Sequence, residues 1–174
     1  MVLYPCTWTH QPHTWIGKGN DEYINSIKAL GNTDYQVIVS LGENSIEIKN
    51  LPKNIELHRS VDQMAVLSIS DVFLTHCGMN SVSEALYYEV PLVMSPQTPE
   101  QCAVAKRVEE LKAGIILKKI DESSIVSSIE KILLDAGYKK SAKNISESFK
   151  NCGGVLAARE FLEKINLCGK SATF

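Results

Sequence analysis

The sequence predicts a single α/β domain, built on a parallel sheet of about six strands with helices on both faces. Short apolar runs alternate with longer amphipathic segments through most of the 174 residues, and this order is typical of parallel strands joined by helical crossovers. The strongest apolar runs are rich in Val, Ile and Leu and show little polar alternation. Strands that are buried on both faces have this composition.

Six segments are expected to form the strands. The strong candidates are 35–42, 71–76, 91–96 and 113–119, and the weaker ones are 2–6 and 54–58. Pro5 lies in the first of the weak segments. Because proline has no N–H to give to a sheet ladder, we expect this segment to end at Pro5 or to lie at an edge of the sheet.

Five segments carry apolar side chains at helical spacing: 20–30, 98–112, 122–135, 139–150 and 154–166. Asp121 or Ser123 is expected to cap the third of them, and Gly153-Gly154 separates the last two. We therefore predict a domain over residues 20–166, followed by a polar tail over 167–174.

The composition excludes several classes of protein. Net charge is −2 and the pI about 6.1, so no basic excess indicates nucleic acid or an anionic membrane as a partner. The five cysteines are odd in number and form no C-x-x-C pair, which favours a reduced, cytoplasmic protein over a disulfide scaffold. We see no signal peptide and no apolar run near the roughly 20 residues of a membrane span.

Residues 1–19 are unusual in composition, and several interpretations are open. The segment is either a first strand and loop, or a divergent or expression-derived terminus. His10 and His13, with Cys6, resemble a metal site only weakly, because no fourth ligand follows at standard spacing, and we predict no metal. Trp8 and Trp15 can stack on a base or sugar, but buried packing explains them equally well.

The turn after the 71–76 strand is the main candidate for a binding site, because ligands of open α/β sheets bind beyond the carboxyl ends of the strands. Gly78 permits a tight turn and close approach of a ligand to the backbone. Asn80 and Ser81 are strong helix-start residues, and the free N–H groups of a helix start suit a phosphate. His76 would add a side-chain donor. An alternative stays open, because Ser81-x-x-Glu84 is also the pattern of a capping box.

A longer pattern continues from this turn. The run "FLTHCGMNSVSEALYYEVPLVMSPQTPEQ" contains H-x-G-x-N-S-x-x-E, then V-P, then P-x-x-x-[DE]-Q. It resembles the donor-binding half of nucleotide-sugar-dependent glycosyltransferases with the GT-B fold, and is most similar to the family of the macrolide, plant secondary-metabolite and glucuronosyl transferases. The resemblance implies a Rossmann-like domain and extends more weakly over residues 20–166.

The resemblance also implies roles for particular residues. His76, Gly78, Asn80 and Ser81 would bind the donor diphosphate, and Glu84 would accept hydrogen bonds from the ribose hydroxyls. Further along the chain, the transferred sugar would be bound by Glu100 and Gln101, and the base would be received by the stretch that contains Val61 and Gln63. No cofactor or metal is implied if the helix start and His76 meet the charge of the diphosphate.

The chain departs from the family pattern at several positions. Ser60 stands where an aromatic residue commonly stacks on the base, and Asp62 replaces a usual proline. Uracil remains the default base, without its usual ring stack. Glu89 replaces a glycine, which costs stability if that turn requires a positive φ. The Gly-Ser or Gly-Thr turn expected after the first strand has no counterpart in "VLYPCTWTHQPHTWIGKGN".

The expected function is donor binding within a UDP-sugar-dependent inverting glycosyltransferase that transfers a hexose to an acceptor hydroxyl. The family's general base belongs to an acceptor-binding domain that no region here matches, so the isolated chain is expected to be inactive. Two alternatives remain: a natural donor subunit that works with a separate acceptor-binding subunit, and a non-catalytic module that binds nucleotide sugars.

Overall fold

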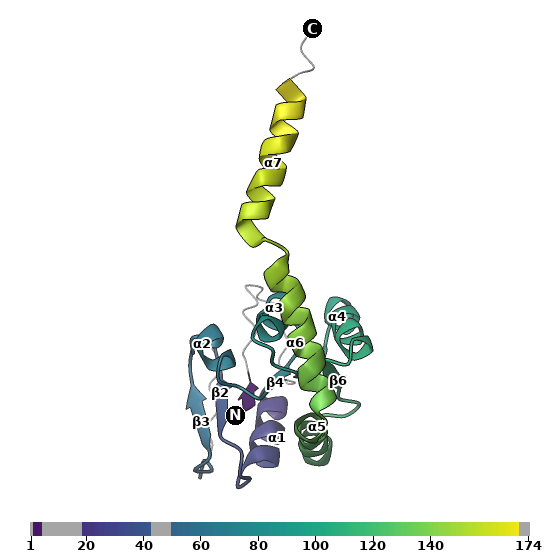
Figure 1. Cartoon of the computed structure of the whole chain (residues 1–174). Helices are drawn as coiled ribbons and strands as arrows, with labels where there is room; N and C mark the ends of the chain where they lie inside the picture. The colour runs from purple at the N-terminus through teal and green to yellow at the C-terminus, as the bar shows by residue number, and fades with distance from the viewer. Residues whose placement is uncertain (1, 5–18, 43–49, 171–174) are drawn as a thin grey trace.

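Six parallel strands form one sheet in the order β3-β2-β1-β4-β5-β6. The computed structural model describes residues 2–4, 19–42 and 50–170, and Figure 1 shows the sheet at the centre of the domain with helices packed against it. The strands are β1 (Val2–Tyr4), β2 (Val37–Ser40), β3 (Ile55–His58), β4 (Val72–Thr75), β5 (Leu92–Met94) and β6 (Gly114–Ile116). The prediction of a parallel sheet of about six strands is confirmed.

The first strand lies in the middle of the sheet. β1 pairs with β2 on one side, with Val2 opposite Val37, and with β4 on the other, with Val2 opposite Val72. The edge position considered for this segment is therefore wrong. The strand spans Val2–Tyr4, and Pro5 lies outside the described residues. The strand order reverses direction at β1 and β4, and such switch points are where open α/β sheets bind ligands.

Helices cover both faces of the sheet, as the sequence predicts. The α helices are α1 (Gly19–Leu30), α2 (Gln63–Leu67), α3 (Met79–Tyr87), α4 (Pro99–Glu110), α5 (Glu122–Leu134), α6 (Ala136–Asn151) and α7 (Gly154–Lys170). On one face, α1 and α5 bury side chains such as Leu30 and Ile129 against β2 and β4. On the other face, α2, α3, α4 and α6 pack around Phe73 and Met94.

The sequence pattern missed one helix and placed one cap well. α2 has only five residues and Leu67 as its buried residue, too few for a helical period to stand out. At the start of α5 the Asp121 side chain accepts a hydrogen bond from the Ser124 N–H at 2.8 Å. This bond, with those from the Ser124 and Ser123 side chains, lowers the pKa of Asp121. Asp121, rather than Ser123, is the cap.

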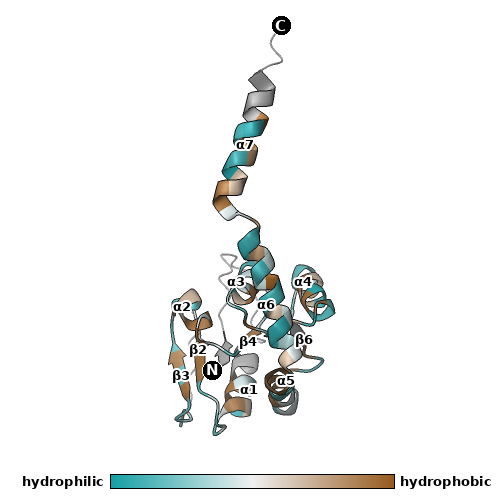
Figure 2. Ribbon diagram, viewed as in Figure 1, coloured by the Kyte–Doolittle hydropathy of each residue, from teal (hydrophilic) through white to brown (hydrophobic). Residues whose placement is uncertain are grey.

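The last helix extends away from the domain (Figure 1). Gly153, between α6 and α7, and Gly154, the first residue of α7, have φ angles of 72° and 52°, in the left-handed region that favours glycine. A Cβ at Gly153 would lie 2.7 Å from that of Ala157. Exposed apolar side chains occur along α7, among them Val155, Leu156 and Phe161. Figure 2, in which the ribbon is coloured by hydropathy, shows hydrophobic and hydrophilic stretches alternating along this helix. Within the part of the chain that the structure describes, none of the helices has the length and apolar character to cross a membrane.

Candidate functional site

The predicted diphosphate turn lies where β4 ends and α3 begins. β4 ends at Thr75, and the backbone turns through His76 and Cys77 to Gly78, the N-cap of α3. Cys77 takes the left-handed conformation, with φ at 67°. Gly78 has φ −59° and ψ 133°, which any residue can adopt, so the expectation that the glycine supplies the tight turn is wrong. The Thr75 Oγ1 accepts a hydrogen bond from the Cys77 N–H at 3.2 Å and holds this turn.

The start of α3 has no side-chain cap. Ser81 is the third residue of the helix, not its N-cap, and Glu84 lies one turn further on, so the capping-box alternative for these two residues is wrong. A helix leaves its first N–H groups without partners inside the helix. At the start of α3 no side chain of the helix takes them up, which is the arrangement an anion requires.

Three of the residues predicted to bind the nucleotide-sugar donor lie close together near the start of α3. The Gln63 Nε2 donates to the Glu84 Oε2 at 2.5 Å and lies 3.4 Å from the Ser81 Oγ. Gln63 opens α2, whereas Ser81 and Glu84 lie on successive turns of α3. Two elements that are 18 to 21 residues apart in sequence thus present an amide, a hydroxyl and a carboxylate at one place. This set can accept from, and donate to, the hydroxyls of a ribose.

His76 and Cys77, which precede Gly78, are buried. His76 is 8% exposed and Cys77 is fully buried. Burial, followed by the influence of Cys102, raises the pKa of the Cys77 thiol to about 12. The thiol therefore stays protonated at neutral pH and is no nucleophile, because thiolates and not thiols attack.

The residues expected to receive the base have distinct local roles. Val61 is half-buried and packs against the core on the α3 face of the sheet. Asp62 caps α2, with its side chain accepting from the Ala65 N–H at 3.1 Å. The departure from proline at this position thus has a structural reason. Ser60 is exposed, and it offers no ring.

Two further residues were predicted to bind the transferred sugar. Glu100 is exposed in the first turn of α4. Gln101 forms a capping box with Thr98: the Thr98 Oγ1 accepts from the Gln101 N–H, and the Gln101 Oε1 accepts from the Thr98 N–H, both at 3.2 Å. The Thr98-x-x-Gln101 spacing is the sequence pattern of a capping box. The Gln101 Nε2 is still a possible donor to a sugar.

Glu89, which replaces the glycine of the family pattern, adopts the positive φ that was expected to cost stability. Glu89 has a φ of 64°. Its Oε1 lies 3.6 Å from the Nζ of Lys150 on α6, and the same Nζ lies 5.3 Å from the centre of the Tyr87 ring. A cation held over a ring and beside a carboxylate offsets part of the backbone cost.

Two further features bear on ligands. An apolar pocket of about 400 Å³ borders Glu84 and is lined by Met64, Ser83, Glu84, Tyr87, Tyr88 and Phe149. No group of three or more His, Cys, Asp or Glu residues that could hold a metal occurs among the described residues. The N-terminal candidates Cys6, His10, His13, Trp8 and Trp15 lie outside the described residues, as does the rest of the segment 5–18 that follows β1.

Comparison with known proteins decides the family. The family model for the C-terminal domain of erythromycin biosynthesis protein CIII-like proteins matches residues 25–151. The chain belongs to the EryCIII-like C-terminal domain family. This match covers all the predicted donor-site residues and most of the sheet.

Two relatives from Bacillus subtilis (strain 168) are similar to this EryCIII-like chain. The UDP-glucosyltransferase YojK is 36% identical over 90% of this chain and 40% of its own length. The UDP-glucosyltransferase YdhE is 32% identical over 95% of this chain and 41% of its own; both are described as uncharacterized. A solved structure, the glycotransferase of kitacinnamycin, superposes with a TM-score of 0.83 over 94% of this chain and 42% of its own, at 23% identity.

These comparisons establish the fold and the family, but the match covers only part of each relative. The chain spans about two fifths of the length of the relatives it matches, and it matches a C-terminal domain. The prediction of a GT-B-type donor half is thereby confirmed at the level of family and fold. The roles of single residues stay predictions.

Proposed function

We propose that this domain binds the nucleotide-sugar donor of a UDP-sugar-dependent inverting glycosyltransferase. The observation that carries the proposal is the meeting of Gln63, Ser81 and Glu84 beside a helix start without a side-chain cap. The names of the relatives YojK and YdhE, both UDP-glucosyltransferases, support a UDP-sugar as the ligand.

The proposed binding follows the order of groups along the donor. The backbone N–H groups at the start of α3, with Gly78, Asn80, the Ser81 hydroxyl and His76, bind the diphosphate. One turn along α3, Glu84 accepts from the ribose hydroxyls, and Gln63 orients its carboxylate. Glu100 and the free amide nitrogen of Gln101 bind hydroxyls of the transferred sugar. The backbone around Val61 receives the base. Carboxylate and amide groups suit vicinal hydroxyls, and a helix start suits a diphosphate.

The role of these residues in transfer is to position the donor and to stabilise the leaving group. As the acceptor hydroxyl attacks the anomeric carbon in line, negative charge grows on the departing diphosphate, and the pre-oriented N–H groups of α3 meet it. The acceptor site and the general base that takes the hydroxyl proton would come from an acceptor-binding half, in the same polypeptide or in a separate subunit.

Two departures from the family pattern have local structural explanations, which weakens the case for a non-catalytic module that only binds nucleotide sugars. Asp62 caps α2, and Lys150 lies beside Glu89, so each departure has a local structural explanation that does not depend on a loss of donor binding. The decisive experiment supplies the chain with an acceptor-binding half from a relative such as YojK and measures hexose transfer from UDP-glucose. Transfer that depends on Glu84 supports the proposal. Tight UDP-glucose binding without any transfer would favour the non-catalytic module.

A further inference from the structure

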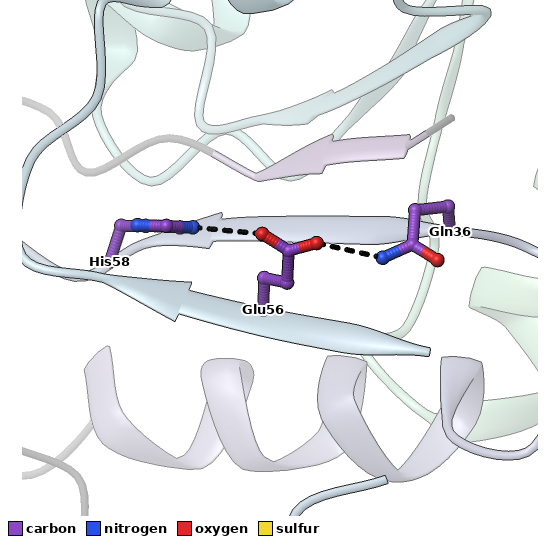
Figure 3. Close-up of polar contacts among 3 residues, drawn as sticks. All are labelled: Gln36, Glu56 and His58. Carbon is purple, nitrogen blue, oxygen red and sulfur yellow. Dashed lines mark hydrogen bonds and ion pairs between the residues drawn. The ribbon is translucent and has the colours of Figure 1, made fainter. Parts of the chain in front are cut away.

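An imidazole lies at the end of the strand that leads into the predicted base site. His58 is the last residue of β3, two residues before Ser60. Its Nε2 lies 3.2 Å from the Glu56 Oε2. The other carboxylate oxygen of Glu56 accepts from the Gln36 Nε2 at 3.0 Å. Figure 3 shows the three side chains in a row across β2 and β3.

This row of side chains lies on the face of the sheet covered by α2 and α3, the helices that carry residues predicted to bind the nucleotide-sugar donor. Successive side chains of a strand point to opposite faces. On β3, Ile55 and Leu57 pack into the core with α1 and α5, so Glu56 and His58 point to the other face. Ile38, which is opposite Glu56 in the register, packs into the core beneath α2 and α3. His58 therefore lies on the α2 and α3 side, at the carboxyl end of its strand, where ligands of such sheets bind.

The contact with Glu56 leaves much of the His58 side chain open to solvent. A carboxylate accepts hydrogen bonds, so the His58 tautomer that carries its proton on Nε2 can donate to Glu56. The His58 side chain is 45% exposed and that of Glu56 is 53% exposed. A pair as exposed as this adds little to the stability of a fold, and the imidazole keeps surface that a ligand can cover.

The stretch predicted to receive the base, which follows His58 directly, has no side chain with a ring that could stack on the base. "RSVDQMAVL", residues 59–67, contains no aromatic residue, and Ser60 occupies the position of the usual stacking residue. From the placement of His58 at the carboxyl end of β3, on the α2 and α3 side of the sheet, and from its partly exposed side chain, we infer that the imidazole of His58 is the stacking surface for the pyrimidine base of the donor. Imidazole is among the rings on which bases stack in proteins. This inference rests on the proposed function and adds a specificity residue to it.

The test is calorimetric titration of the full chain and three variants with UDP and with inorganic pyrophosphate, which has no base. We expect His58→Ala to weaken UDP binding by about fivefold or more, the lower end of the effect of removing a stacked ring. His58→Phe, which keeps a ring, should bind UDP within about twofold of the unchanged chain. Lys53→Ala, an exposed change before β3, is the matched control and should bind normally. Pyrophosphate binding should be the same in all four.

Each other outcome overturns the inference in a recognisable way. If the unchanged chain binds UDP and His58→Ala binds it equally well, the imidazole is only a solvated partner of Glu56, and the proposed function stands. If pyrophosphate binding falls together with UDP binding, His58 acts through charge and not through stacking. If the unchanged chain binds neither ligand, the proposed function fails, and the inference fails with it.

Discussion

Replacing Glu84 by glutamine tests the ribose role with the smallest change of shape. In the structure one carboxylate oxygen of Glu84 accepts from Gln63 at 2.5 Å, which leaves the other oxygen for a ribose hydroxyl. The amide of Glu84→Gln removes the charge and one acceptor. Hydrogen bonds to charged groups contribute about 1.5–3 kcal/mol, and 1.4 kcal/mol corresponds to a tenfold change in Kd. We therefore expect UDP to bind at least about tenfold more weakly.

The assay is isothermal titration calorimetry with UDP, and with pyrophosphate as the ligand that lacks a ribose. Pyrophosphate should bind Glu84→Gln as it binds the unchanged chain, because the helix start of α3 is untouched. The thermal midpoint should change little, since Glu84 caps no helix. If Glu84→Gln binds UDP as tightly as the unchanged chain, the reasoning about the ribose is refuted. An equal loss of pyrophosphate binding would instead indicate damage to the phosphate cradle.

Three further predictions concern stability and reactivity. Thr98→Ala should lower the free energy of unfolding by about 1 kcal/mol and Tm by about 2–4 °C, because it removes the N-cap of α4. Ser81→Ala should change the free energy of unfolding by less than about 0.5 kcal/mol. Equal losses in thermal unfolding would contradict the assignment of the caps. Peptide mapping after iodoacetamide treatment of the native chain should find Cys102 labelled and Cys77 protected, since burial raises the pKa of the Cys77 thiol to about 12; similar rates would refute this. Glu89→Gly should match or exceed the original Tm and Glu89→Val should fall below it, since φ is positive there; the reverse order would show that the turn is unstrained.

Much of the fold could be predicted because the strands are buried on both faces and therefore appear as continuous apolar runs. The weak β3 segment is an edge strand with two exposed residues, Glu56 and His58, which explains its faint pattern. For β1 the proline rule left two possibilities, a strand end or a sheet edge, and the pairing of Val2–Tyr4 with both β2 and β4 excludes the edge. α2 was missed because a five-residue helix has too few turns to show a period.

The candidate site was predictable to the extent that its residues are close in sequence. The spacing of Ser81 and Glu84 was visible, but the same spacing fitted a capping box, and only the position of the helix start separates the two. The link from Gln63 to Glu84 spans 21 residues and depends on how α2 packs beside α3. The left-handed Cys77 was also hidden, because the neighbouring Gly78 was the obvious residue for a turn.

The central claim is that the start of α3, with Glu84 and Gln63, binds a nucleotide sugar. Titration of the chain with UDP-glucose by calorimetry, beside Glu84→Ala, tests it most directly. We predict saturable one-to-one binding by the unchanged chain and binding at least about tenfold weaker by the variant. A chain that binds neither UDP-glucose nor UDP, or a Glu84→Ala variant that binds as the unchanged chain does, would contradict the claim.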